Sequence, residues 1–194
     1  LAMGLAALLS HLQVAGVDTR LGDGRHVMLD LVLLIIVLVA GRVLPFFTGK
    51  VIPGYAGVTR RNVEVAAIGG ALVLVLADLV PGLPAYLHAL LWLLFALIQF
   101  VRLHGWFDRR VFRMPVLWVL HVGYAWLVLG ALLVGLAGFG LFLSTAALHA
   151  LTAGAVGVFT LGMMARVARG HTGRSIDVTR STALAFMLIN LAVV

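Results

Sequence analysis

The sequence predicts an all-α protein, a polytopic bundle of about six or seven transmembrane helices. Hydrophobic residues make up 63% of the chain and charged residues only 11%, whereas a soluble domain has roughly half and a quarter. The mean hydropathy is +1.15. A chain of 194 residues with so few charges could not cover this apolar surface in water. We therefore divide the sequence into membrane-spanning segments.

A transmembrane helix needs about 20 apolar residues, and about seven apolar runs approach or exceed that length. They are Leu1–Val17, Val27–Leu44, Val63–Val80, Pro84–Val101, Met114–Leu136, Phe139–Ala165 and Thr179–Val194. We expect them to form a single transmembrane domain over residues 1–194. Both chain ends fall inside apolar runs, so we expect the first and last spans to be incomplete and further helices to exist in the full protein.

The loops alternate between basic and uncharged. Most of the arginines and the single lysine, Lys50, lie in three connecting segments, namely Gly41–Asn62, Arg102–Arg113 and Arg166–Arg180. The turns at Pro81–Leu83 and Ala137–Gly138 carry no charge. The positive-inside rule predicts this alternation and places the basic loops in the cytoplasm. We expect Pro45 to end the second helix.

Composition also excludes several classes of function. The net charge is +7, but the basic residues lie between apolar runs, so the expected partner is the lipid bilayer and not a nucleic acid. Cysteine is absent, which excludes disulfides and thiolate metal sites. The chain has no Walker loop, dinucleotide-binding fingerprint, HExxH or GxSxG motif, so it does not resemble a soluble enzyme.

Histidines inside the predicted spans are the first functional candidates, because burying an ionisable side chain in a membrane is costly. There are four of them: His11, His88 and His149 in the outer half, at depths of about 6–12 Å, and His121 about 10 Å from the cytoplasmic side. Converging neutral imidazoles suit haem iron or copper. The alternative is that each histidine forms a hydrogen bond to a neighbouring helix. Aromatic residues that could wall a porphyrin pocket are Trp92, Phe95, Trp118, Tyr124 and Trp126.

The basic segments supply two more candidates. Arg42, in the stretch GRVLPFFTGK, could hold a propionate or another anion, or it could extend to the membrane interface and help set the topology. The stretch RVARGHTGRS from Arg166 to Ser175 contains His171, which could receive an anion or shield a cofactor, although an ordinary positive-inside loop explains its charges. Asp30 and Asp78, near the outer ends of their spans, are expected to be interfacial, with a proton relay as the alternative.

Three stretches together resemble the NnrS family of bacterial inner-membrane proteins. They are GRVLPFFTGK from Gly41, LWVLHVGYAWLVLG from Leu117, and LHALTAGAVGVFTLGMMARVARGHTGR from Leu148 to Arg174. The resemblance implies a haem- and copper-containing protein of about twelve spans, of which this chain is a C-terminal portion. It also implies a link to denitrification and to protection against nitric oxide (nitrosative) stress. The positions carried over by these motifs are Arg42, His121, His149 and His171, with His121 and His149 as candidate metal ligands.

Three functions are therefore open at the level of sequence. The first is a haem- and copper-binding membrane protein that responds to nitric oxide or to metal complexes derived from it. The second is a proton- or metal-linked transporter that uses the histidines within its spans. The third is a non-catalytic scaffold in which the histidines only pack. The sequence assigns neither a reaction nor an oligomeric state.

Overall fold

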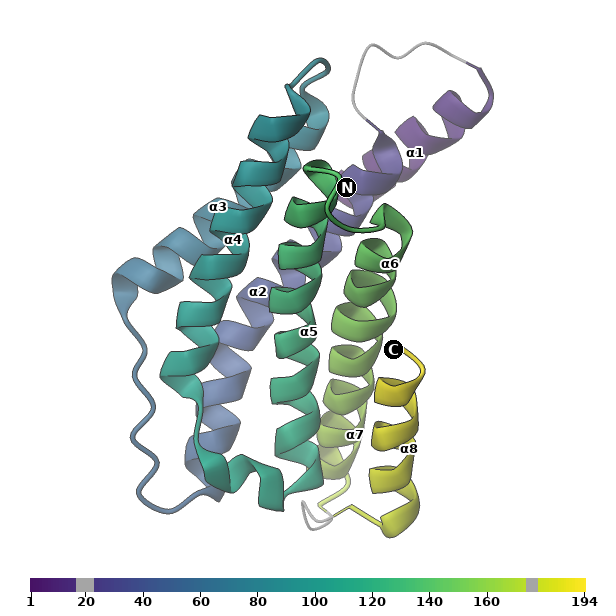
Figure 1. Cartoon of the computed structure of the whole chain (residues 1–194). Helices are drawn as coiled ribbons and strands as arrows, with labels where there is room; N and C mark the ends of the chain where they lie inside the picture. Colours follow the sequence, from purple (N-terminus) through teal and green to yellow (C-terminus); the bar gives the residue numbers. More distant parts are fainter. Residues whose placement is uncertain (17–22, 174–177) are drawn as a thin grey trace.

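The computed structural model describes residues 1–16, 23–173 and 178–194, and its regular elements are all helices (Figure 1). In chain order they are α1 (Ala2–Val14), α2 (Gly24–Val51), α3 (Arg61–Leu79), α4 (Ala85–Trp106), the 3-10 helix η1 (Arg109–Arg113), α5 (Pro115–Gly138), α6 (Ser144–His149), the π-helix η2 (Ala150–Val158), α7 (Phe159–His171) and α8 (Arg180–Leu191). The predicted all-α class is confirmed.

Five helical segments are long and apolar enough to cross a membrane: α2, α3, α4, α5, and the continuous segment Ser144–His171 formed by α6, η2 and α7. The two terminal helices are shorter, with 13 residues in α1 and 12 in α8. At a rise of about 1.5 Å per residue they reach about 20 Å, less than the ~30 Å hydrocarbon core of a bilayer. The predicted number of full spans was therefore slightly too high.

The helices form an up-and-down bundle around α5. This helix contacts α4 on one side and α6, η2 and α7 on the other, and it also contacts α2. Helices α1 and α3 pack on α2, and α3 also packs on α4. The short turns between α3 and α4 and between α5 and α6 lie at one end, and the longer basic connections lie at the opposite end (Figure 1). The alternation predicted from the loop charges is therefore present in the bundle. We call these the turn end and the basic end.

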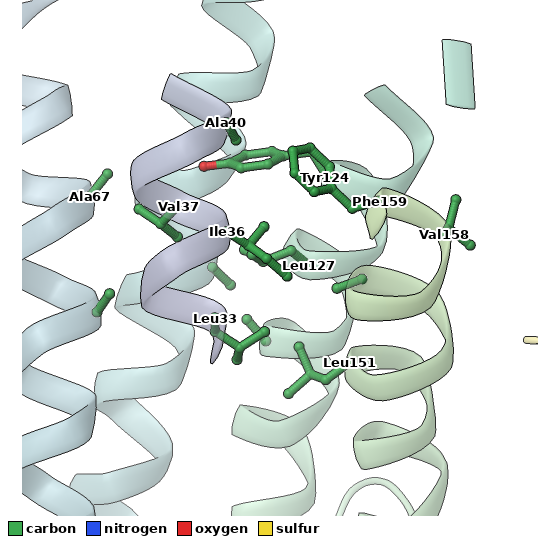
Figure 2. Close-up of a cluster of buried hydrophobic side chains, with 14 of the residues drawn as sticks. Leu33, Ile36, Val37, Ala40, Ala67, Tyr124, Leu127, Leu151, Val158 and Phe159 are labelled. Carbon is green, nitrogen blue, oxygen red and sulfur yellow. The ribbon is translucent and has the colours of Figure 1, made fainter. Parts of the chain in front are cut away.

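Apolar side chains from α2, α5 and the sixth helical segment meet in the centre of the bundle. Figure 2 shows Ile36 of α2 beside Leu127 of α5, with Leu33, Leu151 and Phe159 in the same layer of side chains, and Val37 on the side of α2 toward Ala67 of α3. Small residues bring the backbones close together, as expected for helices packed in lipid. At Gly123, for example, an added Cβ would lie 2.8 Å from the backbone of Phe159.

Two of the predicted helix ends are wrong. Pro45 lies inside α2, which continues to Val51. Proline removes only the hydrogen bond to the carbonyl of Gly41, and such interruptions are tolerated where neighbouring helices surround the backbone. Helix α4 likewise continues to Trp106, so Arg102 lies within a span and not in a loop.

The sixth span begins later and ends later than predicted, and its middle is a π-helix. Regular structure starts at Ser144 and continues to His171. The nine-residue π-helix η2 follows His149 directly; π-helical turns are rare and frequent at functional sites. Gly154 in this segment packs against the Trp126 ring, where an added Cβ would lie 2.8 Å from Cγ. The small residues thus serve close packing on α5.

Candidate functional site

His121 has a buried ring nitrogen with no hydrogen-bond partner. The residue lies on α5 and is 5% exposed. Its Nδ1 is 2.9 Å from the carbonyl oxygen of Leu117, and because a carbonyl only accepts, Nδ1 carries the proton. In a neutral imidazole the lone pair is then on Nε2, which is buried and unpartnered. Proteins commonly present a histidine to a metal ion in this way.

Trp106 lies beside His121 near the basic end of the bundle. The backbone of Trp106, the last residue of α4, lies close to the His121 ring, but it forms no hydrogen bond of ordinary geometry with Nε2. The buried Trp106 ring packs on Tyr124 with 5.4 Å between centroids. The Trp106 carbonyl accepts a hydrogen bond of 2.8 Å from the Tyr55 hydroxyl. Burial raises the pKa of Tyr55 to about 12, so this hydroxyl keeps its proton and remains a donor at physiological pH.

A buried arginine, Arg102, joins four helices. It contacts α5 at Tyr124, about one helical turn from His121. The Arg102 side chain of α4 is 1% exposed and forms a bidentate ion pair with Glu64 of α3. Its Nη1 donates to the carbonyl of Val37 on α2 and to the hydroxyl of Tyr124 on α5, both at 2.9 Å. The guanidinium also lies 4.7 Å from the Trp106 ring centroid. Arg102 therefore fixes α2, α3, α4 and α5 relative to one another.

Gly41 provides the space for this ion pair on α2. A Cβ at this position would overlap Nη2 of Arg102 and would lie 2.8 Å from Oε2 of Glu64. Because Pro45 has no N–H, the Gly41 carbonyl also lacks its usual helical partner. The motif GRVLPFFTGK thus contains a glycine where the arginine of another helix approaches the backbone.

The network continues from Arg102 to an amide. The Tyr124 hydroxyl donates to Oε1 of Gln99, and the amide of Gln99 donates to the carbonyl of Ala67 at 3.3 Å. Gln99 is fully buried. This chain of bonds satisfies the polar groups that four helices bury together.

A cavity of about 280 Å³ adjoins the ion pair at the basic end of the bundle. Glu64, Arg102 and Trp106 line its inner wall, and Arg60 and His104 line the mouth. Positive groups outnumber the single carboxylate, so the cavity suits an anionic group better than a cation.

The structure does not bring the predicted histidines together. His11, His149 and His171 are exposed on α1, α6 and α7, and Arg42 is exposed on α2. The Nε2 atom of His149 lies 3.4 Å from the carbonyl oxygen of Ala192. Among the described residues no group of three or more His, Cys, Asp or Glu could hold a metal ion. Part of the predicted basic stretch after His171, residues 174–177, lies outside the described residues.

His88 contacts a carboxylate. Its Nε2 lies 2.7 Å from Oδ1 of Asp78 on α3, near the turn end of the bundle. This contact is separate from His121, which lies near the basic end.

The predicted aromatic walls are divided between two places. Trp118 and Trp126 line an apolar groove of about 720 Å³ between α5 and α8. Trp92, Phe95 and Tyr124 are instead part of the packed core.

Sequence reasoning missed Glu64, Gln99 and Arg102. The available signal was a charge or an amide inside an apolar run, which is the criterion that selected the histidines. Arg102 was missed because the end of its helix was placed too early.

These features define a polytopic α-helical membrane protein with a buried polar network next to a histidine whose Nε2 is free. The NnrS protein family matches the chain over residues 1–194, and the chain belongs to this family. No curated protein and no solved structure matches it.

Proposed function

We propose that the protein binds haem or copper through His121 and acts in the response to nitric oxide in the bacterial inner membrane. The observation that carries the proposal is the buried, unpartnered Nε2 of His121. An imidazole nitrogen left without a partner in an apolar interior costs about 1–3 kcal/mol, and a metal ion that accepts its lone pair removes that cost.

The environment of His121 fits a metal ligand. The carbonyl of Leu117 holds the proton on Nδ1 and thereby fixes both the tautomer and the ring direction. Imidazole is a ligand of both copper and haem iron. Family membership is consistent with a nitric-oxide-response membrane protein, and this supports the same assignment.

The two cofactors would place different demands on the chain. A copper ion needs much less space than a porphyrin. A haem needs an apolar pocket, and the groove with Trp118 and Trp126 is of the volume that proteins use for such ligands. Because His121 does not line that groove, the present geometry favours copper at His121.

The protein's own residues would orient the site and limit access of water. Trp106 lies beside His121 and packs on Tyr124, and the Arg102–Glu64 pair holds the helices that carry these two rings. When bound, haem or copper would supply an open metal position at which nitric oxide could bind. The basic end of the bundle, which the positive-inside rule places in the cytoplasm, supports the proposed inner-membrane location.

The first test is metal analysis and optical spectroscopy of the full chain in mild detergent, after expression with added haem and copper. We expect bound metal in the wild type and a spectrum that changes with nitric oxide. His121→Ala should lose at least one equivalent of metal per chain. His104→Ala, at an exposed histidine of α4, is the matched control and should keep it.

Two results would overturn the proposal. One is a wild type that contains neither metal after supplementation. The other is a folded His121→Ala variant with a full complement of metal and an unchanged spectrum. His149→Ala, tested in parallel, would show whether the second predicted ligand contributes. Cellular tolerance to nitric oxide, measured with the same variants, tests the proposed role.

A further inference from the structure

Three ionisable side chains from three helices meet near the turn end of the bundle. Asp30 lies on α2, Asp78 on α3 and His88 on α4. His88 Nε2 is 2.7 Å from Asp78 Oδ1, and the carboxyl groups of Asp78 and Asp30 lie within hydrogen-bonding reach of each other. The three groups therefore form a continuous chain: imidazole, carboxyl, carboxyl.

Burial increases along this chain. The side chain of His88 is 31% exposed and that of Asp78 10% exposed, and Asp30 as a residue is 3% exposed. His88 lies one turn into α4, directly after the turn that joins α3 to α4. The chain thus runs from the turn-end surface, where water can reach His88, to a carboxyl group inside the bundle.

As two carboxylates, Asp30 and Asp78 would be incompatible with this geometry. Both would only accept hydrogen bonds, and Oδ2 of Asp30 is buried without a donor. Two like charges in contact in a medium of low dielectric constant also repel strongly. A single proton between the groups removes both problems, because it supplies the missing donor and neutralises one charge.

A second buried polar atom points to the same region. Trp92, one turn along α4 from His88, is 3% exposed, and its indole N–H has no partner. Its ring meets the His88 ring edge-on, with 6.4 Å between centroids. A buried donor without a partner, next to the His88 ring, is typical of a site that takes up a water molecule.

The helices around the cluster offer no other counter-charge in the described part of the chain. On the α1 side, Ala6 packs with Val27 and Val75, and His11 is exposed. Arg25, near the start of α2, is paired with Asp23, and His26, one turn before Asp30 on the same helix, is exposed. The half of α5 at the turn end carries no ionisable residue, which leaves His88 as the basic group in contact with the carboxyl pair.

We propose that Asp30, Asp78 and His88 form a proton-binding site in which the two carboxyls share one proton, exchanged with the outer aqueous phase through His88. In the loading direction, His88 takes a proton from water on Nδ1 and gives its Nε2 proton to Asp78, which passes a proton to Asp30. One proton enters, the imidazole returns to its neutral form, and the carboxyl pair gains one positive charge. This proposal is independent of metal binding at His121.

The test is infrared difference spectroscopy of the full chain in lipid nanodiscs, through the carbonyl stretching band of a protonated carboxylic acid. We expect this band in the wild type at neutral pH, where exposed carboxylates are ionised. The sequence has only seven acidic side chains, so the band can be assigned by substitution. Asp30→Asn and Asp78→Asn should each abolish it, whereas Asp108→Asn, at an exposed ion pair, should leave it unchanged.

A second measurement tests the route through His88. Transfer into heavy water shifts the band as the proton is replaced by deuterium. His88→Gln should keep the band at neutral pH and slow this shift, while His104→Gln should not affect its rate.

Absence of the band from the wild type at neutral pH would overturn the proposal, and this result does not depend on any variant folding. A band that persists in both folded Asp→Asn variants would also overturn it. Unchanged exchange in His88→Gln would overturn the assigned route.

Discussion

The sharpest stability prediction concerns Gly41→Ala, a change of one methyl group on α2. The added Cβ would occupy the position of Arg102 Nη2 and would lie 2.8 Å from Glu64 Oε2. The guanidinium cannot simply turn away, because Nη1 is held by the carbonyl of Val37 and by Tyr124. The substitution therefore displaces a buried ion pair from its hydrogen-bond partners.

The magnitude follows from what the displaced pair loses. Disrupting a buried ion pair costs about 3–5 kcal/mol, and Ala in place of Gly inside a helix returns up to about 1 kcal/mol. We therefore expect the free energy of unfolding to fall by about 3 kcal/mol. For a chain of this size that corresponds to a decrease in Tm of about 6–12 °C.

The assay is reversible unfolding of the detergent-solubilised chain by a denaturing detergent, followed by circular dichroism and tryptophan fluorescence. Gly69→Ala on α3 is the matched control, because a Cβ there would meet no atom within 4 Å. It should change stability by less than about 1 kcal/mol.

A double-mutant cycle with Arg102→Ala separates the proposed cause from a general effect on α2. If Gly41 matters because it accommodates Arg102, the substitution Gly41→Ala should cost less than about 0.5 kcal/mol once the guanidinium is gone. The reasoning is refuted if Gly41→Ala behaves like Gly69→Ala. It is also refuted if its cost is undiminished in the Arg102→Ala background.

Three further predictions concern other contacts. Arg110 holds the pKa of Asp108 at about 2, below the ordinary ~3.9. The contribution of Asp108 to stability should therefore be complete above about pH 4 and be lost as the pH falls through about 2. A carboxyl carbon NMR titration should show that midpoint, and Arg110→Gln should return it toward ~3.9; an unmoved midpoint would contradict the assigned cause. Asn190→Leu removes the amide oxygen that accepts a 2.8 Å hydrogen bond from the Trp126 indole N–H. It should weaken the packing of α8 on α5 by about 1–2 kcal/mol, and proteolysis between α7 and α8 at the wild-type rate would argue against this. Gly123→Ala places a Cβ 2.8 Å from the backbone of α7 and should lower the free energy of unfolding by about 2–3 kcal/mol. A decrease below about 0.5 kcal/mol in the unfolding assay would show that α5 and α7 separate easily.

The class of this protein could be predicted from its sequence because the surrounding medium, lipid or water, limits the amino-acid composition of a folded chain. A chain with 63% hydrophobic residues is compatible with lipid and not with water. The basic residues in alternate loops predict which side of the membrane each loop faces, and hence the direction of each helix. Position along a helix was also predictable. His121 was expected about 10 Å from the basic end, and it lies six residues into α5, about 9 Å.

Helix ends were less predictable. Pro45 and Arg102 both suggested the end of a span, since proline breaks isolated helices and arginine usually marks the interface. In the bundle, α2 continues beyond Pro45, and Glu64 neutralises Arg102 within the interior. Both wrong helix ends depend on neighbouring helices. The sequence of a single segment does not show which helices pack against it.

The sequence by itself therefore determined the membrane class, the alternation of the helices and the depth of His121, but not the depth of Arg102. Only the tertiary structure decided which polar residues meet. Depth follows from the rise per residue, but the direction of a side chain depends on rotation about the helix axis and on which helix packs there. For this reason His11 and His149 are exposed, His88 meets Asp78, and His121 alone among the four histidines predicted within spans presents a buried, free nitrogen.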